Sequence, residues 1–69
     1  MTSGQHKILD YIKDNDGVTE YNIWGNTGIP YDIIREALRR LKNRMLIETS
    51  FVKTSQIGGY TLYRSKTYV

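Results

Sequence analysis

Five cationic side chains are concentrated in one short stretch of the chain, and their types suit the binding of a polyanion. They recur at helical spacing: Arg35, Arg39, Arg40, Lys42 and Arg44. Such groups donate hydrogen bonds to phosphate oxygens, and an arginine can also donate two parallel bonds to guanine. Residues 30–44 hold five cations against two acids, whereas residues 1–29 hold two cations against four acids. This uneven distribution favours a nucleic-acid partner over a merely solvated helix face.

The residue types that usually perform catalysis are scarce in this chain. There is no cysteine and one histidine, His6, and no nucleophile is paired with a base that could activate it. Asp10, Asp14 and Asp16 lie on or just beyond a polar helix end, where solvation explains them. The sequence has neither the spacing of a metal site nor a Walker-type phosphate loop. We therefore expect no enzymatic activity, no metal and no cofactor.

A helix over residues 30–44 is needed to present the cations on one surface. Its apolar residues fall within a narrow arc when about 100° is allowed per residue: Ile34, Ala37, Leu38 and Leu41. This arc predicts a buried side, with the charged residues projecting away from it. Pro30 suits the first turn, because its missing N–H would be unpaired there and its φ is already helical.

The residues before this helix have the pattern of a helix-turn-helix. A short second helix is expected over residues 19–26, capped by the hydroxyl of Thr19. Gly28 then stands in a turn at the position where a positive φ is easiest for glycine. A first helix is expected over residues 3–15, with the Ser3 hydroxyl as its cap.

A β-hairpin is expected after the third helix, over residues 47–64. Residues 47–53 alternate and include Thr, Phe and Val, as a strand should, and residues 60–64 form the returning strand. The connection over residues 54–59 is too long for a two-residue turn and is rich in flexible residues. These features predict a projecting wing.

This succession of elements resembles the winged helix-turn-helix superfamily of DNA-binding domains. Members typically show Thr or Ser, an apolar-small pair, Thr-Gly-Ile, Val-x-x-Ala-Leu-x-x-Leu and then Gly-Leu-Ile. The corresponding residues here are Thr19, Ile23-Trp24, Thr27-Gly28-Ile29, Ile34-x-x-Ala37-Leu38-x-x-Leu41 and Met45-Leu46-Ile47. Trp24 replaces the small residue that usually lets two helices approach, and Met45 replaces the Gly that usually ends the third helix. The resemblance implies one α+β domain over residues 1–69, a three-helix winged helix-turn-helix with a C-terminal β-hairpin wing.

The resemblance also implies sequence-specific binding of double-stranded DNA by a small transcriptional regulator, of the kind found in viruses, plasmids and archaea. The helix over residues 30–44 would read the major groove. Its candidate base contacts are Tyr31, Asp32, Ile33, Arg35 and Glu36, and its candidate phosphate contacts are Arg39, Arg40 and Lys42. The candidate contacts of the wing with the DNA backbone or minor groove are Lys53, Thr54, Ser55 and Gln56.

One alternative is a winged-helix protein–protein interaction module that does not bind DNA directly, in which the basic face would dock on an acidic surface. Readers of left-handed nucleic acid form a second alternative. They typically carry an Asn on the third helix and a Pro-x-Trp wing, and this chain has Ile34-Arg35 on that helix and no proline after Pro30.

Aromatic and aliphatic residues exceed what a small core requires. A chain of 69 residues buries only a modest core and is marginally stable alone, so we expect a homodimer. Trp24 is assigned to the core or to the dimer interface. The C-terminal segment offers further interface candidates: Tyr60, Leu62, Tyr63, Tyr68 and Val69.

The sequence lacks the features of export or membrane insertion. Residues 1–16 are polar and carry three Asp, unlike a signal peptide. No apolar run approaches the roughly 20 residues of a membrane span. We therefore expect a cytoplasmic protein without membrane contact, and we predict no small-molecule ligand.

Overall fold

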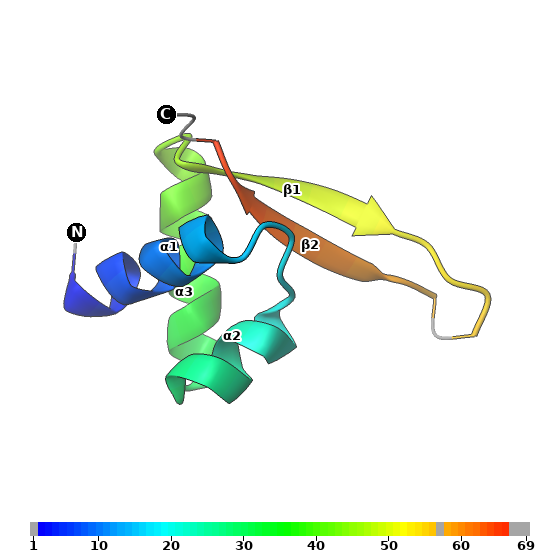
Figure 1. The fold of residues 1–69 in the computed structure, drawn as a ribbon, viewed down its shortest axis with the longest axis horizontal. Coiled ribbons are helices and arrows are strands. Elements are labelled where there is room, and N and C mark those ends of the chain that lie inside the picture. Colours follow the sequence, from blue (N-terminus) through cyan, green and yellow to red (C-terminus); the bar gives the residue numbers. More distant parts are fainter. Residues whose placement is uncertain (1, 57, 67–69) are drawn as a thin grey trace.

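The computed structural model describes residues 2–56 and 58–66, in which three helices precede a two-stranded antiparallel hairpin (Figure 1). The helices are α1 (Ser3–Asp14), α2 (Glu20–Thr27) and α3 (Tyr31–Asn43). The strands are β1 (Ile47–Val52) and β2 (Tyr60–Ser65), paired from Ile47 opposite Ser65 to Val52 opposite Tyr60. This is the expected three-helix winged helix-turn-helix with a C-terminal wing. Ile57 of the expected wing, and the interface candidates Tyr68 and Val69, lie outside the described residues.

Local hydrogen bonds set the start of α1 and α2. The Thr19 hydroxyl accepts from the Asn22 backbone N–H at 3.1 Å, and the Asn22 side chain accepts from the Thr19 N–H at 3.1 Å, which confirms the predicted cap. The cap expected at Ser3 is wrong by one residue. Thr2 caps α1, because Gln5 stands three positions later and completes the same reciprocal pair with it.

The ends of α2 and α3 have left-handed residues where the superfamily pattern places glycine. Gly28 closes α2 with φ 72°, as predicted. Met45 takes φ 61° although it has a side chain, and the turn still closes, with the Leu46 N–H donating to the Leu41 carbonyl at 3.0 Å. Pro30 does not occupy the first turn of α3. It precedes the helix as its N-cap residue with ψ 149°.

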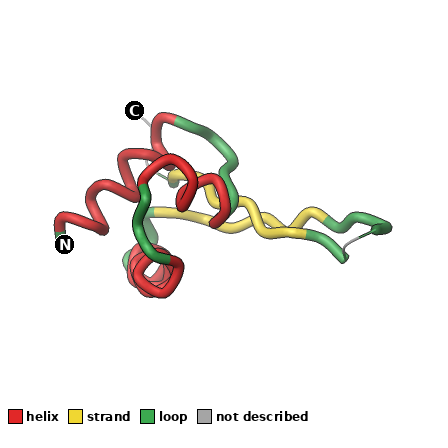
Figure 2. The backbone as a smooth tube through the Cα atoms, turned by 90° about the horizontal axis from the view of Figure 1, so that it is seen from below, coloured by secondary structure: helices red, strands yellow, loops and turns green. Residues whose placement is uncertain are grey.

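The core lies between the three helices and the base of the hairpin. It contains all four residues predicted for the apolar side of α3, joined by residues of the other elements: Ile8, Leu9, Ile12, Val18, Ile23 and Ile47. Seen from below, α3 lies nearly end-on and the hairpin runs away from the helices as an arm (Figure 2). No helix within residues 2–56 and 58–66 combines the length and the apolar composition needed to cross a membrane.

Backbone hydrogen bonds attach the hairpin to the helices. Tyr63 and Val18 exchange two backbone hydrogen bonds, of 2.7 and 3.1 Å, so β2 is tied to the segment between α1 and α2.

At the outer end of the hairpin, Gly59 has φ 124°, and a Cβ there would come within 2.5 Å of the Val52 carbonyl oxygen and 2.6 Å of the Phe51 ring. Only glycine fits this position.

Candidate nucleic-acid interface

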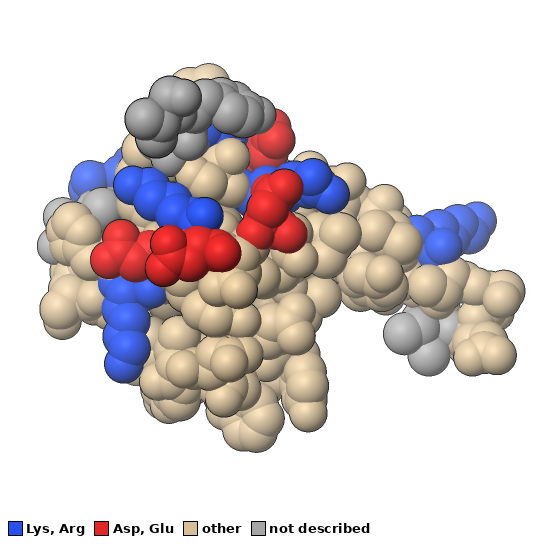
Figure 3. Space-filling view, in the orientation of Figure 1, with Lys and Arg blue, Asp and Glu red and all other residues tan. Residues whose placement is uncertain are grey.

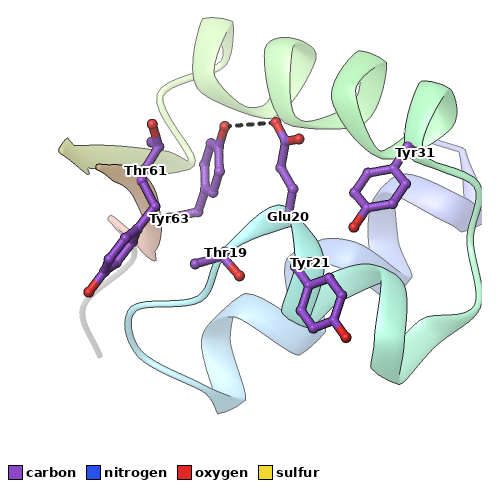
Figure 4. A pocket seen from close by; sticks show the side chains of 7 residues that line it. Thr19, Glu20, Tyr21, Tyr31, Thr61 and Tyr63 are labelled. Carbon is purple, nitrogen blue, oxygen red and sulfur yellow. Dashed lines mark hydrogen bonds between the residues drawn. The ribbon is translucent and has the colours of Figure 1, made fainter. Parts of the chain in front are cut away.

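A concave surface lies between α3 and the hairpin, with the start of α2 at its base. It consists of two adjoining hollows of about 340 and 370 Å³ that share Glu20, Thr61 and Tyr63. We call this surface the α3–wing groove; its other lining residues are Thr19, Tyr21, Tyr31, Arg35, Leu38, Arg39, Lys42, Thr49 and Tyr60. Figure 4 shows the first hollow, where the Tyr63 hydroxyl faces the Glu20 carboxylate and further tyrosine and threonine side chains complete the lining. Hydroxyl and cationic groups dominate the lining, which suits an anionic, hydrogen-bonding ligand.

Glu20 connects three elements of this groove. One carboxylate oxygen accepts a hydrogen bond from the Tyr63 hydroxyl on β2 at 3.2 Å (Figure 4). The other accepts from Nε of Arg35 on α3 at 3.4 Å. Burial raises the pKa of the Tyr63 hydroxyl, and the charge of Glu20 and the hydrogen bond to it raise this pKa further. The carboxylate therefore links helix α2 to both flanks of the groove.

Three aromatic rings form a cluster at the end of the groove where α3 begins. The rings of Trp24 and Tyr31 are stacked, with centroids 5.7 Å apart and planes at 15°, and the Tyr21 ring lies 5.8 Å from that of Trp24 with its plane tilted by 41°. The guanidinium carbon of Arg35 is 5.9 Å from the centroid of Tyr31. Trp24 is 42% exposed, so its assignment to the core is wrong. The indole stacks on the surface, and Ile23 is the buried residue of α2 among those described.

The predicted contacts of α3 lie on two different sides of the helix. Arg35, Arg39 and Lys42 line the α3–wing groove together with Tyr31. A different hollow, against the start of α1, is lined by Asp32, Ile33, Glu36 and Arg40. Every predicted contact on α3 except the half-buried Tyr31 is exposed. An elongated ligand lying along α3 could therefore reach both groups, whereas the wing faces only the first.

Glu36 is already engaged by neighbouring arginines on α3. Its carboxylate accepts from Nε of Arg40 at 2.8 Å and from the Arg39 guanidinium at 2.8 and 3.3 Å. The hydrogen bond from Arg40, and then that from Arg39, lower the pKa of Glu36. If Glu36 accepts a hydrogen bond from cytosine, its carboxylate oxygens must be shared between the base and these two arginines.

The predicted contacts of the wing lie beyond the end of β1. Lys53, Thr54, Ser55 and Gln56 follow Val52 directly and form part of the connection to β2. In the view of Figure 3, positive charge is visible on this outer part of the hairpin, while the surface over α2 shows neither sign. Among the described residues, no group of three His or acidic side chains could hold a metal ion.

Sequence reasoning missed the part of the groove that α2 and β2 contribute. Glu20, Thr61 and Tyr63 were not assigned to the interface, although they line both hollows. The alternation of β2 could have indicated that Thr61 and Tyr63 share one face. No local sequence pattern could indicate the hydrogen bond between Tyr63 and Glu20, because these residues are 43 positions apart in the chain.

Comparisons with known proteins support this fold. No protein-family model matches the sequence, and no curated protein has significant sequence similarity to it. Among solved structures, the chain is similar to the PcaV transcriptional regulator of Streptomyces coelicolor, which was determined in complex with its natural ligand. The similarity covers 96% of this chain with a TM-score of 0.80 and 26% sequence identity. The chain spans about half the length of PcaV, since the match covers 45% of that protein.

Proposed function

We propose that this chain binds double-stranded DNA sequence-specifically, as the DNA-binding domain of a transcriptional regulator that acts inside the cell. The observation that carries the proposal is the α3–wing groove, in which Arg35, Arg39 and Lys42 face the hairpin. The winged-helix fold shared with the PcaV regulator supports the same function.

The dimensions of B-form DNA suit this arrangement. The major groove admits one α-helix, and the adjacent minor groove is separated from it by a single phosphate backbone. With α3 in the major groove and the hairpin against the flanking minor groove, that backbone would run along the part of the α3–wing groove that Arg39, Lys42 and Thr49 line. The hydroxyls of Thr49 and Thr61, on the groove face of the hairpin, would then donate to its phosphates.

The proposed contacts fall into three groups. Base contacts come from the first turns of α3: Tyr31, Asp32, Ile33, Arg35 and Glu36. Phosphate contacts come from later turns: Arg39, Arg40 and Lys42. Wing contacts with the flanking backbone or minor groove come from the start of the connection after β1: Lys53, Thr54, Ser55 and Gln56. Phosphate contacts supply affinity and register, and base contacts supply specificity.

A salt titration of binding to random and genomic duplexes tests the proposal, combined with selection of bound sequences. We expect log Kd to depend on log salt with a slope of several units, and an enriched motif. The double variant Arg39→Ala/Lys42→Ala should lower the slope by about two. The matched control is Lys7→Ala/Lys13→Ala, which removes two exposed cations from α1. Equal effects of the two pairs, or no DNA binding, would overturn the proposal.

The second candidate function is a protein–protein interaction module. One observation favours it: the aromatic side chains of Tyr21 and Trp24 are 66% and 42% exposed, with their ring centroids 5.8 Å apart. Exposed aromatic rings of this kind often mark protein interfaces. The titration separates the two functions, because a module of this class would not enrich any DNA motif.

A further inference from the structure

We propose that Glu20 is a positioning residue that holds Arg35 in the orientation needed to bind a guanine in the major groove. The inference rests on the proposed function and adds to it a residue of α2 that makes no base contact itself. It also assigns the stacked rings of Trp24 and Tyr31 a part in DNA recognition.

The first restraint on Arg35 is the carboxylate of Glu20. It accepts from the Arg35 Nε at 3.4 Å through one oxygen, and from the Tyr63 hydroxyl at 3.2 Å through the other. Tyr63 is itself fixed, because its backbone exchanges two hydrogen bonds with Val18. The position of the carboxylate is therefore determined by the hairpin as well as by α2.

The second restraint is the aromatic stack. The Arg35 guanidinium lies over the Tyr31 ring at 5.9 Å from its centroid, and Tyr31 stacks on Trp24 at 5.7 Å. Arginine pairs well with aromatic faces in this way. The carboxylate at one edge and the ring at one face both restrict the rotamers of Arg35. A guanidinium restrained in this way before DNA binds would lose less conformational entropy on binding.

The atom that Glu20 engages determines what Arg35 can still bind. A bidentate contact with guanine O6 and N7 uses two donor groups on one edge of the guanidinium. Because Glu20 accepts a hydrogen bond from Nε of Arg35, the two terminal nitrogens of the guanidinium remain available to donate to the base. The carboxylate would also repel a phosphate near Arg35, which disfavours use of this arginine on the backbone of unrelated sequences.

The exposure of this ion pair indicates where its effect should be sought. The side chains of Arg35 and Glu20 are 69% and 30% exposed, and ion pairs this accessible contribute little to folding stability. Glu20→Gln should therefore leave thermal unfolding almost unchanged. The substitution should instead change how the protein distinguishes one DNA sequence from another.

The experiment compares variants on the duplex selected by the wild type and on copies with the critical guanine pair replaced. The wild type should prefer guanine by about 5- to 150-fold, and Arg35→Ala should abolish that preference. Glu20→Gln should reduce the preference by about threefold or more and bind random duplex about two- to fivefold more tightly. Adding Glu20→Gln to Arg35→Ala should change the base preference no further, because the two residues act as a unit.

The matched control is Glu48→Gln, the same chemical change on β1. Glu48 alternates with Thr49 and so lies on the strand face opposite the groove. The Glu48→Gln variant should have the same base preference as the wild type. The inference would be overturned if Glu20→Gln kept the full guanine preference, or if Glu48→Gln lost as much of it. It would also be overturned if the selected motif contained no guanine whose recognition depends on Arg35. These outcomes would leave the proposed function standing. Failure of the wild type to bind any duplex would overturn the proposed function and, with it, the inference.

Discussion

Tyr63 joins the hairpin to the helices through both its backbone and its side chain. Its backbone pairs with Val18, and its hydroxyl donates to Glu20. Burial, followed by the charge of Glu20 and the hydrogen bond to it, raises the pKa of Tyr63 above its ordinary value of 10.0. The folded state therefore holds this proton more tightly than the unfolded chain does.

This difference predicts a loss of stability at alkaline pH. The contribution of Tyr63 is complete below the pKa of the unfolded chain and is lost as pH rises through the raised pKa of the fold. Urea unfolding from about pH 8 to about pH 11 should show a steeper fall in the free energy of unfolding for the wild type than for Tyr63→Phe. Tyr60→Phe, on the same strand, should behave like the wild type. Parallel curves for the wild type and Tyr63→Phe would contradict the prediction.

Individual residues differed in how well the sequence could predict their roles. The buried residues of α3 were predictable, because Ile34 and Leu41 belong to one stripe at helical period. The part played by Glu20 was not, since it depends on the placement of Arg35 and Tyr63, which are 15 and 43 residues away. The exposure of Trp24 depends likewise on Tyr31, across the turn between α2 and α3.

At the scale of elements, the junction between α3 and β1 carries local strain. Met45 has φ 61° and is 69% exposed, so no packing of its side chain offsets the left-handed backbone. Met45→Gly should raise the free energy of unfolding by about 0.5–1 kcal/mol, the relief of strain being partly offset by the greater entropy of the unfolded chain. Met45→Ala keeps the strain and should give no gain. Thermal or urea unfolding measures both, and equal stability of the two variants would contradict this account.

The outer end of the hairpin requires glycine for a steric reason. A Cβ at Gly59 would approach the Val52 carbonyl oxygen to 2.5 Å, so Gly59→Ala should lower the free energy of unfolding by about 1–3 kcal/mol. The matched control is Gly25→Ala, because a Cβ there meets nothing within 4 Å and alanine favours a helix. That control should be neutral or stabilising. If urea unfolding shows the same effect for both substitutions, the steric explanation is wrong.

The order of elements was predictable because the signals for their ends are local. Thr19 with Asn22, and Gly28 after α2, need only neighbouring residues. The start of α1 at Ser3 was predicted, but its cap was misplaced by one residue, because Thr2 and Ser3 are both capable caps and Gln5 decides between them. Pro30 was placed inside α3, but its ψ of 149° keeps it outside the helix.

At the scale of the molecule, the basic groove and the exposed aromatic rings adjoin each other at Tyr31, over which the Arg35 guanidinium lies. The cations of α3 that line the α3–wing groove face the hairpin, and the part of α2 seen in Figure 3 shows no charge. The sequence indicated the basic helix because its cations are close together along the chain. It could not indicate the aromatic cluster, because Tyr21, Trp24 and Tyr31 come from two helices. The aromatic rings thus extend from the basic groove, at Tyr31, to the exposed face of α2, at Trp24.

The exposed aromatic surface leads to our prediction about assembly, in which it contacts a second copy of the chain. Small domains gain stability from association, and a symmetric dimer uses the same patch twice. Sedimentation should show a dimer, and Trp24→Ala should shift it toward monomer more than Phe51→Ala, which removes an exposed ring from the hairpin. On DNA, the two α3 helices should occupy half-sites about 34–36 Å apart, and the selected motif should be an inverted repeat. A monomer both free and on DNA, with a single asymmetric footprint, would contradict the prediction.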